Sequence, residues 1–141
     1  MSNLISQGYT EVIIGSDDGD YYLLKDGNYY VVGNDGNDRV TFSDGNDTFF
    51  AGASDTGNDN IDGRGGDDLL GGGPGNDSLQ GQEGSDTIFG GSGNDVIFLD
   101  WNSSPDATLG DFNIAWGGAG DDRIMSLGNS RSIVGGGDGN D

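Results

Sequence analysis

Apolar residues recur once every nine positions along most of this chain. From residue 15 to 50, and again from 54 to 98, the eighth residue of each nine-residue block is apolar and the sixth is in most blocks Asp. Side chains two residues apart in an extended strand share a face, so the sixth and eighth residues point inward together. The pattern therefore predicts short strands separated by turns. The inward apolar residues predicted for them are Tyr22, Val31, Val40, Phe49, Ile61, Leu70, Leu79, Ile88 and Ile97.

The best-preserved blocks lie at residues 72–98. Each block there has Gly at its first and fourth positions, Asp at its sixth and an aliphatic residue at its eighth. Gly permits the positive φ of a sharp turn, and such a turn leaves several carbonyl oxygens converging beside the Asp carboxylate. A flexible loop that offers only oxygen ligands suits Ca²⁺ better than Mg²⁺, Zn²⁺ or Cu²⁺. The spacing therefore predicts calcium sites in the turns.

The repeat frame divides the chain into four segments. Residues 1–14 are predicted to form an N-terminal cap strand, and residues 15–98 form the main repeats, interrupted by a three-residue insertion at 51–53. Residues 99–116 break the motif but number eighteen, so they are either two degenerate repeats or a looped-out insertion. Residues 117–141 contain further repeats, the last of them incomplete.

Composition narrows the range of functions. The 141 residues include 30 Gly, and the formal net charge is −20. Low hydrophobicity with high charge usually favours disorder, but the periodicity argues for one folded domain. The charge disfavours nucleic acid and anionic lipid as partners and favours multivalent cations. The chain has no Cys and no His, which excludes thiolate or imidazole metal sites and the usual catalytic triads, so we expect no enzymatic activity.

The motif Gly-Gly-x-Gly-x-Asp-x-U-x, where U is a large aliphatic residue, resembles the calcium-binding nonapeptide repeat of the RTX (hemolysin-type) family. This resemblance covers most of the chain. It implies an all-β fold, a parallel β-roll or right-handed β-solenoid, in which each repeat gives a turn and a short strand and two repeats make one coil. It also implies that Ca²⁺ is the cofactor and lies in the Gly/Asp-rich turns, each ion shared by repeats two apart on the same edge.

The resemblance implies metal ligands at the sixth and fourth positions of the repeats. The implied ligands are the carboxylates of Asp20, Asp38, Asp47, Asp59, Asp68, Asp77, Asp86, Asp95, Asp122 and Asp141, and the carbonyls of Gly36, Gly45, Gly57, Gly66, Gly75, Gly84, Gly93 and Gly120. The implied carboxylate pairs are, on one edge, Asp20 with Asp38, Asp38 with Asp59, Asp59 with Asp77 and Asp77 with Asp95, and on the other edge Asp47 with Asp68, Asp68 with Asp86 and Asp122 with Asp141.

Three repeats depart from this pattern. Tyr29, Asn113 and Arg131 stand where the frame expects the Asp, so sites that draw on these repeats are expected to be weak or absent. For Arg131 two interpretations stay open. Its guanidinium either replaces the charge of a missing ion by binding carboxylate or carbonyl oxygens, or it is a solvated side chain of a degenerate repeat.

The seventh and ninth positions predict the two outer faces. If the insertion at 51–53 does not switch edges, one sheet is apolar and the other polar in its middle. The apolar sheet would show Val12, Ile14, Tyr30, Val32, Thr48, Phe50, Leu69, Thr87, Phe89 and Met125, and the polar sheet Arg39, Thr41, Asn60, Asp62, Ser78 and Gln80. We expect the apolar sheet to be covered, either by residues 99–116 with Trp101 and Trp116 or by another molecule.

Two functional interpretations remain open. The first is a calcium-binding structural module of a secreted or cell-surface protein that folds on binding Ca²⁺, such as a subunit of an extracellular layer or filament. The alternative is an accessory carbohydrate- or substrate-binding module of a secreted enzyme or toxin. The five basic residues are scattered along the sequence, which counts against binding a polyanion.

The two ends of the chain bear on location and assembly. The N-terminal segment lacks the charged and apolar regions of a signal peptide, and no apolar run could span a membrane. We therefore expect an extracellular or cell-surface location reached without such a signal, and no membrane insertion. The chain stops at Asp141, one ligand into a site shared with Asp122. This indicates either a fragment of a longer array or head-to-tail self-association, in which the Ile13 coil of the next molecule completes the site.

Overall fold

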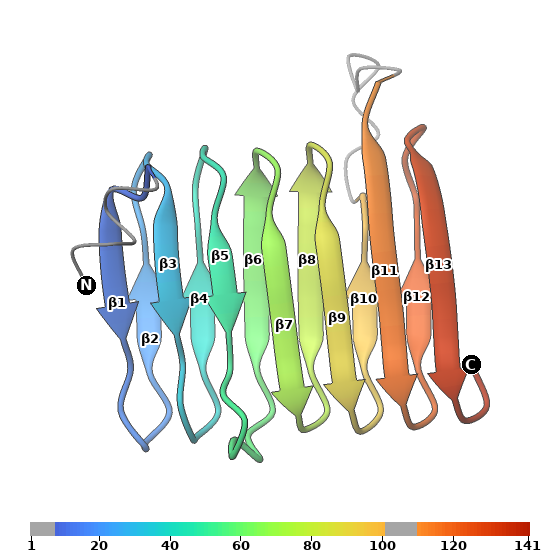
Figure 1. Cartoon of the computed structure of the whole chain (residues 1–141), viewed down its shortest axis with the longest axis horizontal. Helices are drawn as coiled ribbons and strands as arrows, with labels where there is room; N and C mark the ends of the chain where they lie inside the picture. The colour runs from blue at the N-terminus through green and yellow to red at the C-terminus, as the bar shows by residue number, and fades with distance from the viewer. Residues whose placement is uncertain (1–7, 101–109) are drawn as a thin grey trace.

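The computed structural model describes residues 8–100 and 110–141, which wind into a parallel β-solenoid (Figure 1). These residues contain strands and turns but no helix. The strands are β1 (Glu11–Ile14), β2 (Tyr21–Leu23), β3 (Tyr29–Val32), β4 (Arg39–Thr41), β5 (Thr48–Phe50), β6 (Asn60–Gly65), β7 (Leu69–Pro74), β8 (Ser78–Glu83), β9 (Thr87–Ser92), β10 (Val96–Phe98), β11 (Phe112–Ala119), β12 (Arg123–Met125) and β13 (Arg131–Asp138).

Successive strands alternate between two sheets. The seven-stranded sheet has the order β1-β3-β5-β7-β9-β11-β13, and the six-stranded sheet has the order β12-β10-β8-β6-β4-β2. All paired strands are parallel, as a solenoid requires, because each coil returns to the same sheet in the same direction. Two strands and two turns make one coil, which gives about seven coils. The predicted all-β, parallel β-solenoid architecture is confirmed.

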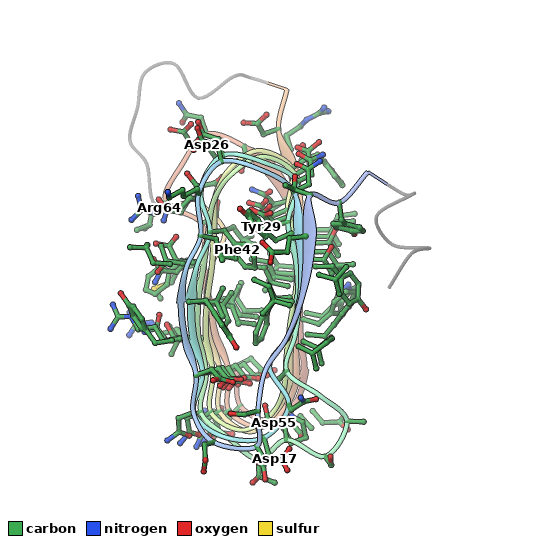
Figure 2. The ribbon with its side chains drawn as sticks, turned by 90° about the vertical axis from the view of Figure 1, so that its left-hand side faces the viewer. Asp17, Asp26, Tyr29, Phe42, Asp55 and Arg64 are labelled. Carbon is green, nitrogen blue, oxygen red and sulfur yellow. The ribbon has the colours of Figure 1, made fainter. Side chains whose placement is uncertain are left out.

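The core is a single column of apolar side chains between the sheets. The inward residues predicted from Val31 to Ile97 are at most 1% exposed, whereas Ile13 and Tyr22 in the first coil are only partly buried. Three further side chains join the column where the frame has no inward residue: Phe42, Ala51 and Leu99. Phe42 and Leu99 replace the first-position Gly of their repeats and are buried beside the six-stranded sheet. Figure 2 shows Phe42 inside the roll. The core is therefore larger than one apolar residue per repeat.

The length of each coil shows where the repeat frame changes. Equivalent Asp residues of neighbouring coils are 18 residues apart in regular coils and 21 apart across the insertion at 51–53. Asp95 and Asp122 are 27 residues apart, nine more than a regular coil. The segment 99–116 is therefore one repeat plus nine extra residues, rather than two repeats of the coil. This shifts β12 to the six-stranded sheet, so Met125 faces outward there and its predicted place on the apolar sheet was wrong.

One further extra residue lies before β13. Asp122 and Asp141 are 19 residues apart, and Val134 pairs in register with the inward residue Ala115. Ile133 therefore faces outward, although it stands at the eighth position of the unbroken nine-residue frame. Arg131 pairs in register with Phe112, one place before the sixth position, which is occupied by Ser132. The hypothesis that Arg131 stands at a ligand position was wrong.

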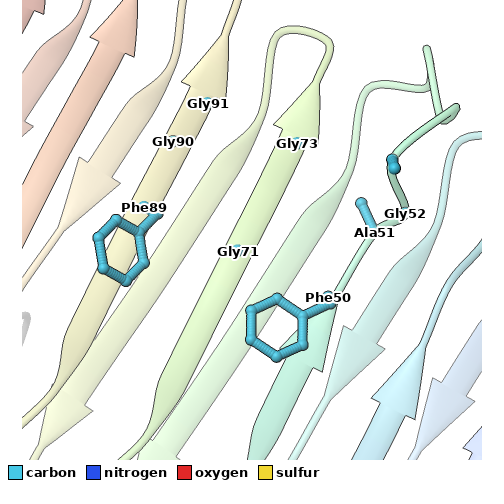
Figure 3. A pocket seen from close by; sticks show the side chains of 9 residues that line it. Phe50, Ala51, Gly52, Gly71, Gly73, Phe89, Gly90 and Gly91 are labelled. Atoms are coloured by element: carbon cyan, nitrogen blue, oxygen red, sulfur yellow. The ribbon is translucent and has the colours of Figure 1, made fainter.

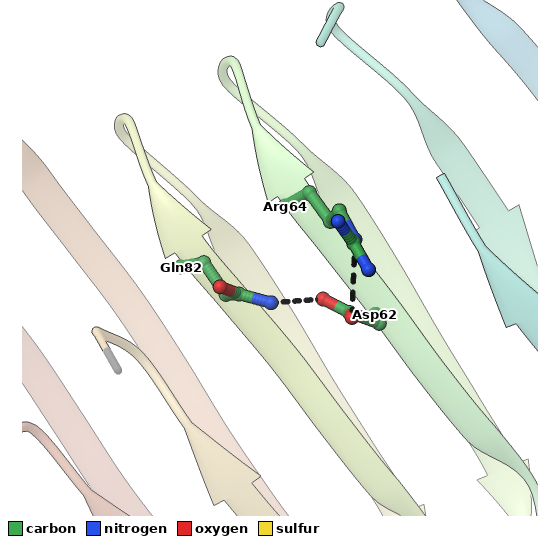
Figure 4. Close-up of polar contacts among 3 residues, drawn as sticks. All are labelled: Asp62, Arg64 and Gln82. Carbon is green, nitrogen blue, oxygen red and sulfur yellow. Dashed lines mark hydrogen bonds and ion pairs between the residues drawn. The ribbon is translucent and has the colours of Figure 1, made fainter. Parts of the chain in front are cut away.

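The outer face of the six-stranded sheet is polar in its middle, as predicted. Asp62 on β6 forms an ion pair with Arg64 (Nε to Oδ2, 3.5 Å) and accepts a hydrogen bond from the side-chain amide of Gln82 on β8 (Figure 4). Arg64 and Gln82 both adopt a positive φ at the second position of their repeats. The same backbone conformation is adopted by Gly at that position in other repeats, for example Gly73.

The fourth-position Gly residues allow the coils to stack closely. A Cβ atom added to Gly93 would lie 1.7 Å from the carbonyl oxygen of Gly75, and Gly93 has a φ of 124°. Around Gly110, in contrast, no atom of residues 8–100 or 110–141 lies within 4 Å of an added Cβ. Close stacking of the turns therefore leaves no room for a Cβ atom at Gly93, whereas it places no such limit on Gly110.

We predict that Gly93→Ala destabilises the calcium-bound protein strongly, on the order of 3 kcal/mol or more, because the added methyl group clashes with backbone and the φ is unfavourable for Ala. Gly110→Ala should change stability by less than about 0.5 kcal/mol. Urea unfolding in calcium-containing buffer measures both. Equal stability of the two variants would contradict this account of the stacking.

Candidate calcium sites

The inward Asp side chains form a row along each edge of the roll. In each row the backbone N–H of one sixth-position residue donates a hydrogen bond to Oδ1 of the next, at about 2.8 Å for Asp59 to Asp77 and Asp77 to Asp95. The first row contains Asp20, Asp38, Asp59, Asp77, Asp95, Asp122 and Asp141. The second row contains Tyr29, Asp47, Asp68, Asp86 and Asn113.

These rows keep all but one of the implied neighbour pairs on their predicted edges. Asp122 and Asp141 belong to the first row, although the repeat frame placed them on the opposite edge. The nine extra residues before β11 equal half a regular coil, so every later repeat changes edge. Asp95 and Asp122 become neighbours as a result, a pair that the repeat frame does not predict.

The second oxygen of each inner carboxylate is buried without a hydrogen-bond partner. This holds for Oδ2 of Asp38, Asp47, Asp59, Asp68, Asp77, Asp86, Asp95 and Asp122. The oxygen folds back over its own turn: Oδ2 of Asp77 lies 2.4 Å from the place of a Cβ on Gly72. Figure 2 shows side-chain oxygens gathered inside the roll at both ends of its elongated cross-section. A buried carboxylate without partners is costly, so these oxygens point to a cation.

Carbonyl oxygens of the turns lie between successive coils. The carbonyl oxygen of Gly57 approaches the α-carbon of Gly75, so a Cβ on Gly75 would be only 1.7 Å away from it. The positive φ predicted for the fourth-position Gly residues is adopted by all of those proposed as ligands except Gly57. Gly57 follows the insertion, and its N–H donates to the carboxylate of Asp55 (2.7 Å).

The donor set fits Ca²⁺. No three His, Cys, Asp or Glu side chains converge on one point within residues 8–100 and 110–141, so side chains alone do not form a site there. The available donors are pairs of carboxylates from neighbouring coils and the carbonyls of the turns. All of these are hard oxygen ligands, and Ca²⁺ takes six to eight such ligands in flexible geometry. An ion shared by neighbouring coils would neutralise carboxylates that the fold places together.

Burial raises the pKa of these carboxyl groups. Desolvation is the largest cause, and the backbone N–H that donates to each Oδ1 partly opposes it. The pKa of Asp38 and that of Asp59 are raised above 3.8 by the same cause. The pKa is raised to about 6 for Asp47 and Asp95, to about 7 for Asp77 and Asp86, and to about 9 for Asp68. Without a cation, the folded state therefore favours the protonated carboxyl groups.

Asp55 is an inward carboxylate that the repeat frame does not predict. It is 1% exposed, and its Oδ2 has no hydrogen-bond partner. Its charge contributes to the raised pKa values of Asp38, Asp59 and Asp77, so it lies beside the first row. Asp55 stands at the second position of its repeat, where the motif has Gly. An Asp at that place directly after an insertion is the sequence signal that would have identified it.

A second set of hydrogen bonds, also not predicted, runs along the fifth positions. The N–H of Asn76 donates to Oδ1 of Asn58, and the N–H of Asn94 donates to Oδ1 of Asn76, both at 2.7 Å. These bonds point toward the N-terminus, whereas those of the Asp rows point toward the C-terminus. The Asn of the repeated Asn-Asp pair therefore joins turns on the outside of each edge.

The second row ends in residues that need no ion. Asn113 accepts the N–H of Asp86 (2.7 Å), and its amide donates to Oδ1 of Asp100 (2.9 Å) and to Ser130 (3.0 Å). Oδ2 of Asp100 accepts from the hydroxyl groups of Ser126 and Ser130. At the other end, Tyr29 contributes no carboxylate, as the sequence shows. The expectation that calcium sites at Tyr29 and Asn113 are weak or absent is therefore consistent with the geometry.

We predict that acid restores folding when calcium is removed. Because the pKa of these groups is raised in the folded state, their protonation stabilises the fold below the unfolded value of 3.8, and this contribution is lost as the pH rises through about 6 to 9. In EDTA, the β-sheet signal in circular dichroism should be stronger at about pH 4 than at about pH 7.5. An equal or weaker signal in acid would contradict the assignment of buried carboxylates.

We also predict that adjacent Asp residues differ in their effect on calcium-induced folding. Asp68→Asn removes a buried charge from the second row, so the Ca²⁺ midpoint of folding should rise roughly threefold or more. Asp67→Asn is the matched control, because Asp67 is exposed and its Oδ1 only accepts the N–H of Ser85 (2.8 Å), which an Asn accepts equally well. Titration followed by circular dichroism compares them. A larger shift for Asp67→Asn would be inconsistent with this site.

Comparison with known families agrees with the geometry. The RTX calcium-binding nonapeptide repeat matches in four copies, over residues 14–49, 53–79, 71–102 and 108–130. These ranges cover more than half of the 141 residues. No curated protein and no solved structure matches the chain. Repeats of this kind bind calcium ions, which are therefore the cofactor of this protein. The chain belongs to the RTX calcium-binding nonapeptide repeat family.

Proposed function

We propose that this chain is a structural module of a secreted or cell-surface protein and that it folds when it binds Ca²⁺. The observation that carries the proposal is the set of buried Oδ2 atoms in the two Asp rows, none of which has a hydrogen-bond partner. One pKa unit corresponds to about 1.4 kcal/mol, and a domain is stable by only about 5–15 kcal/mol. The free-energy cost of ionising several of these carboxyl groups without a counter-ion is therefore larger than the net stability expected of a domain.

The ligands of each ion are proposed to be two successive Asp carboxylates and the carbonyls of their turns. The first row has six gaps between successive carboxylates, and the second row has two. In this proposal Ca²⁺ binds most tightly between the inner Asp residues of the first row. Oδ2 of Asp20 already accepts a hydrogen bond from the N–H of Ser16 (2.7 Å), and Asp141 is exposed. The end gaps are therefore weaker.

An extracellular setting suits this coupling. Calcium is abundant outside cells, where sites with dissociation constants of about 10⁻⁴ to 10⁻³ M are occupied. RTX repeats are typical of secreted proteins. None of the described residues forms a helix long and apolar enough to cross a membrane. In such a setting the chain remains unfolded where calcium is scarce and folds once outside.

The test is circular dichroism of the chain in EDTA, in millimolar Ca²⁺ and in equal Mg²⁺ at neutral pH. We expect a disordered spectrum in EDTA, a cooperative gain of β signal with Ca²⁺, and little gain with Mg²⁺, which demands a smaller and more regular shell. A β spectrum that persists after exhaustive chelation would overturn the proposal. An equal response to Mg²⁺ would overturn the choice of ion.

A further inference from the structure

The outer face of the seven-stranded sheet carries no charged side chain at its seventh and ninth positions. The formal net charge of the whole chain is −20, so such a stretch is unusual. The apolar face, as we call it, consists of Val12, Ile14, Tyr30, Val32, Thr48, Phe50, Leu69, Gly71, Thr87, Phe89, Ile114, Trp116, Ile133 and Gly135. Tyr9 covers one end of it, packing edge-on against Tyr30 and hydrogen-bonding Thr48. The other end stays open within the described part of the chain.

The middle of the apolar face contains a hollow of about 330 Å³ (Figure 3). Its walls are Phe50 and Phe89, and its floor is formed by Gly71, Gly73, Gly90 and Gly91. Phe50, Gly71 and Phe89 are in register on neighbouring strands, and the Phe50 ring leans over Gly71, where an added Cβ would lie 2.8 Å from it. The insertion closes one end with Ala51 and Ala53. No residue that lines the hollow has a polar side chain, which disfavours a sugar.

Beside the hollow, the same face has an aromatic ridge. Phe89 and Trp116 are in register on β9 and β11, and they are 43% and 46% exposed. Trp116 leans over Gly135 of β13, because a Cβ on Gly135 would lie 2.2 Å from its ring. The open part of the apolar face therefore combines a ridge of two exposed aromatic rings with a neighbouring recess.

We propose that the apolar face pairs with the apolar face of a second copy of this chain, the ridge of Phe89 and Trp116 entering the hollow of the partner copy. A ridge and a hollow on one surface are what a two-fold interface needs, because each copy then supplies both halves of the contact. Charge opposes contact least at this face. Two copies that each carry −20 repel each other, but contact through the seventh and ninth positions of this sheet buries no acidic side chain.

The expected contact is small. Seven strands spaced about 4.8 Å apart make a strip roughly 30 Å long, and strands of a few residues give it a width of roughly 15 Å. The two copies together would bury on the order of 1,000 Å², at the lower end for specific interfaces. Pairing is therefore weak and reversible, and it appears only at high protein concentration. It rests on the proposed function, since the face exists only in the calcium-folded chain.

Two matched variants test the proposal by sedimentation velocity in millimolar Ca²⁺ over a range of protein concentrations. Phe89→Lys places a charge on the ridge, and Tyr21→Lys makes the matching change at an exposed aromatic residue on the outer face of the six-stranded sheet. We expect wild type and Tyr21→Lys to form dimers with similar dissociation constants, and Phe89→Lys to dimerise at least about tenfold more weakly. Circular dichroism of each sample shows that it is folded.

A second readout reports the ridge itself. In a Trp101→Phe background, the emission of Trp116 should shift to the blue as protein concentration rises, because pairing removes its exposed ring from water. Folded protein that stays monomeric at high concentration overturns the pairing and leaves the proposed function intact. Equal dimerisation of Phe89→Lys and wild type, loss of dimers in Tyr21→Lys, or growth beyond dimers also overturns it. Failure to fold in Ca²⁺ contradicts the proposed function instead.

Discussion

The stacking of carboxylates inside the turns is the constraint on which the rest of the structure depends. Each coil places the Asp of one repeat so that its Oδ1 accepts a backbone N–H of the preceding coil, as Asp77 does from Asp59. This bond sets the register of the coils but uses only one oxygen of each carboxylate. The other oxygen is left inside the roll, where only a cation or a proton can satisfy it. The same contact therefore sets the register of the coils and, in the function proposed above, makes the stability of the fold depend on a bound cation.

Glycine follows from the same constraint. The unpaired oxygen of Asp68 occupies the space that a Cβ on Gly63 would fill, at 2.2 Å, so the first position must be small in repeats of this type. Where the first position is Phe42 or Leu99, the side chain points inward and enlarges the core. The repeat that begins with Leu99 has lost its inward Asp, with Asn113 in its place, whereas the repeat that begins with Phe42 keeps Asp47. The need for a small first position explains how a chain with 30 Gly forms an ordered solenoid.

Much of the fold and of the candidate site could be predicted because a period of nine residues determines both the strand face and the turn. The inward residues from Val31 to Ile97 follow from it directly, as do the Asp rows from Asp20 to Asp95 and from Asp47 to Asp86. The edge of Asp122 and the position of Arg131 could not be predicted. Eighteen residues without a motif are as consistent with two repeats as with one repeat and a nine-residue insertion. Only the pairing of β11 with β9 distinguishes two repeats from one repeat with an insertion. The extra residue before β13 cannot be recognised in the sequence, because the repeat that contains it is degenerate.

The most direct test of the central claim is the calcium dependence of stability. Ions that bind only the folded state add to the free energy of unfolding in proportion to the logarithm of their concentration, with a slope that counts the ions released. Urea unfolding at a series of free Ca²⁺ concentrations gives that slope. If the buried carboxylates of the two rows are satisfied by shared ions, the slope corresponds to several ions per chain. A slope near zero or one would mean that the rows are satisfied in some other way, and it would contradict the account.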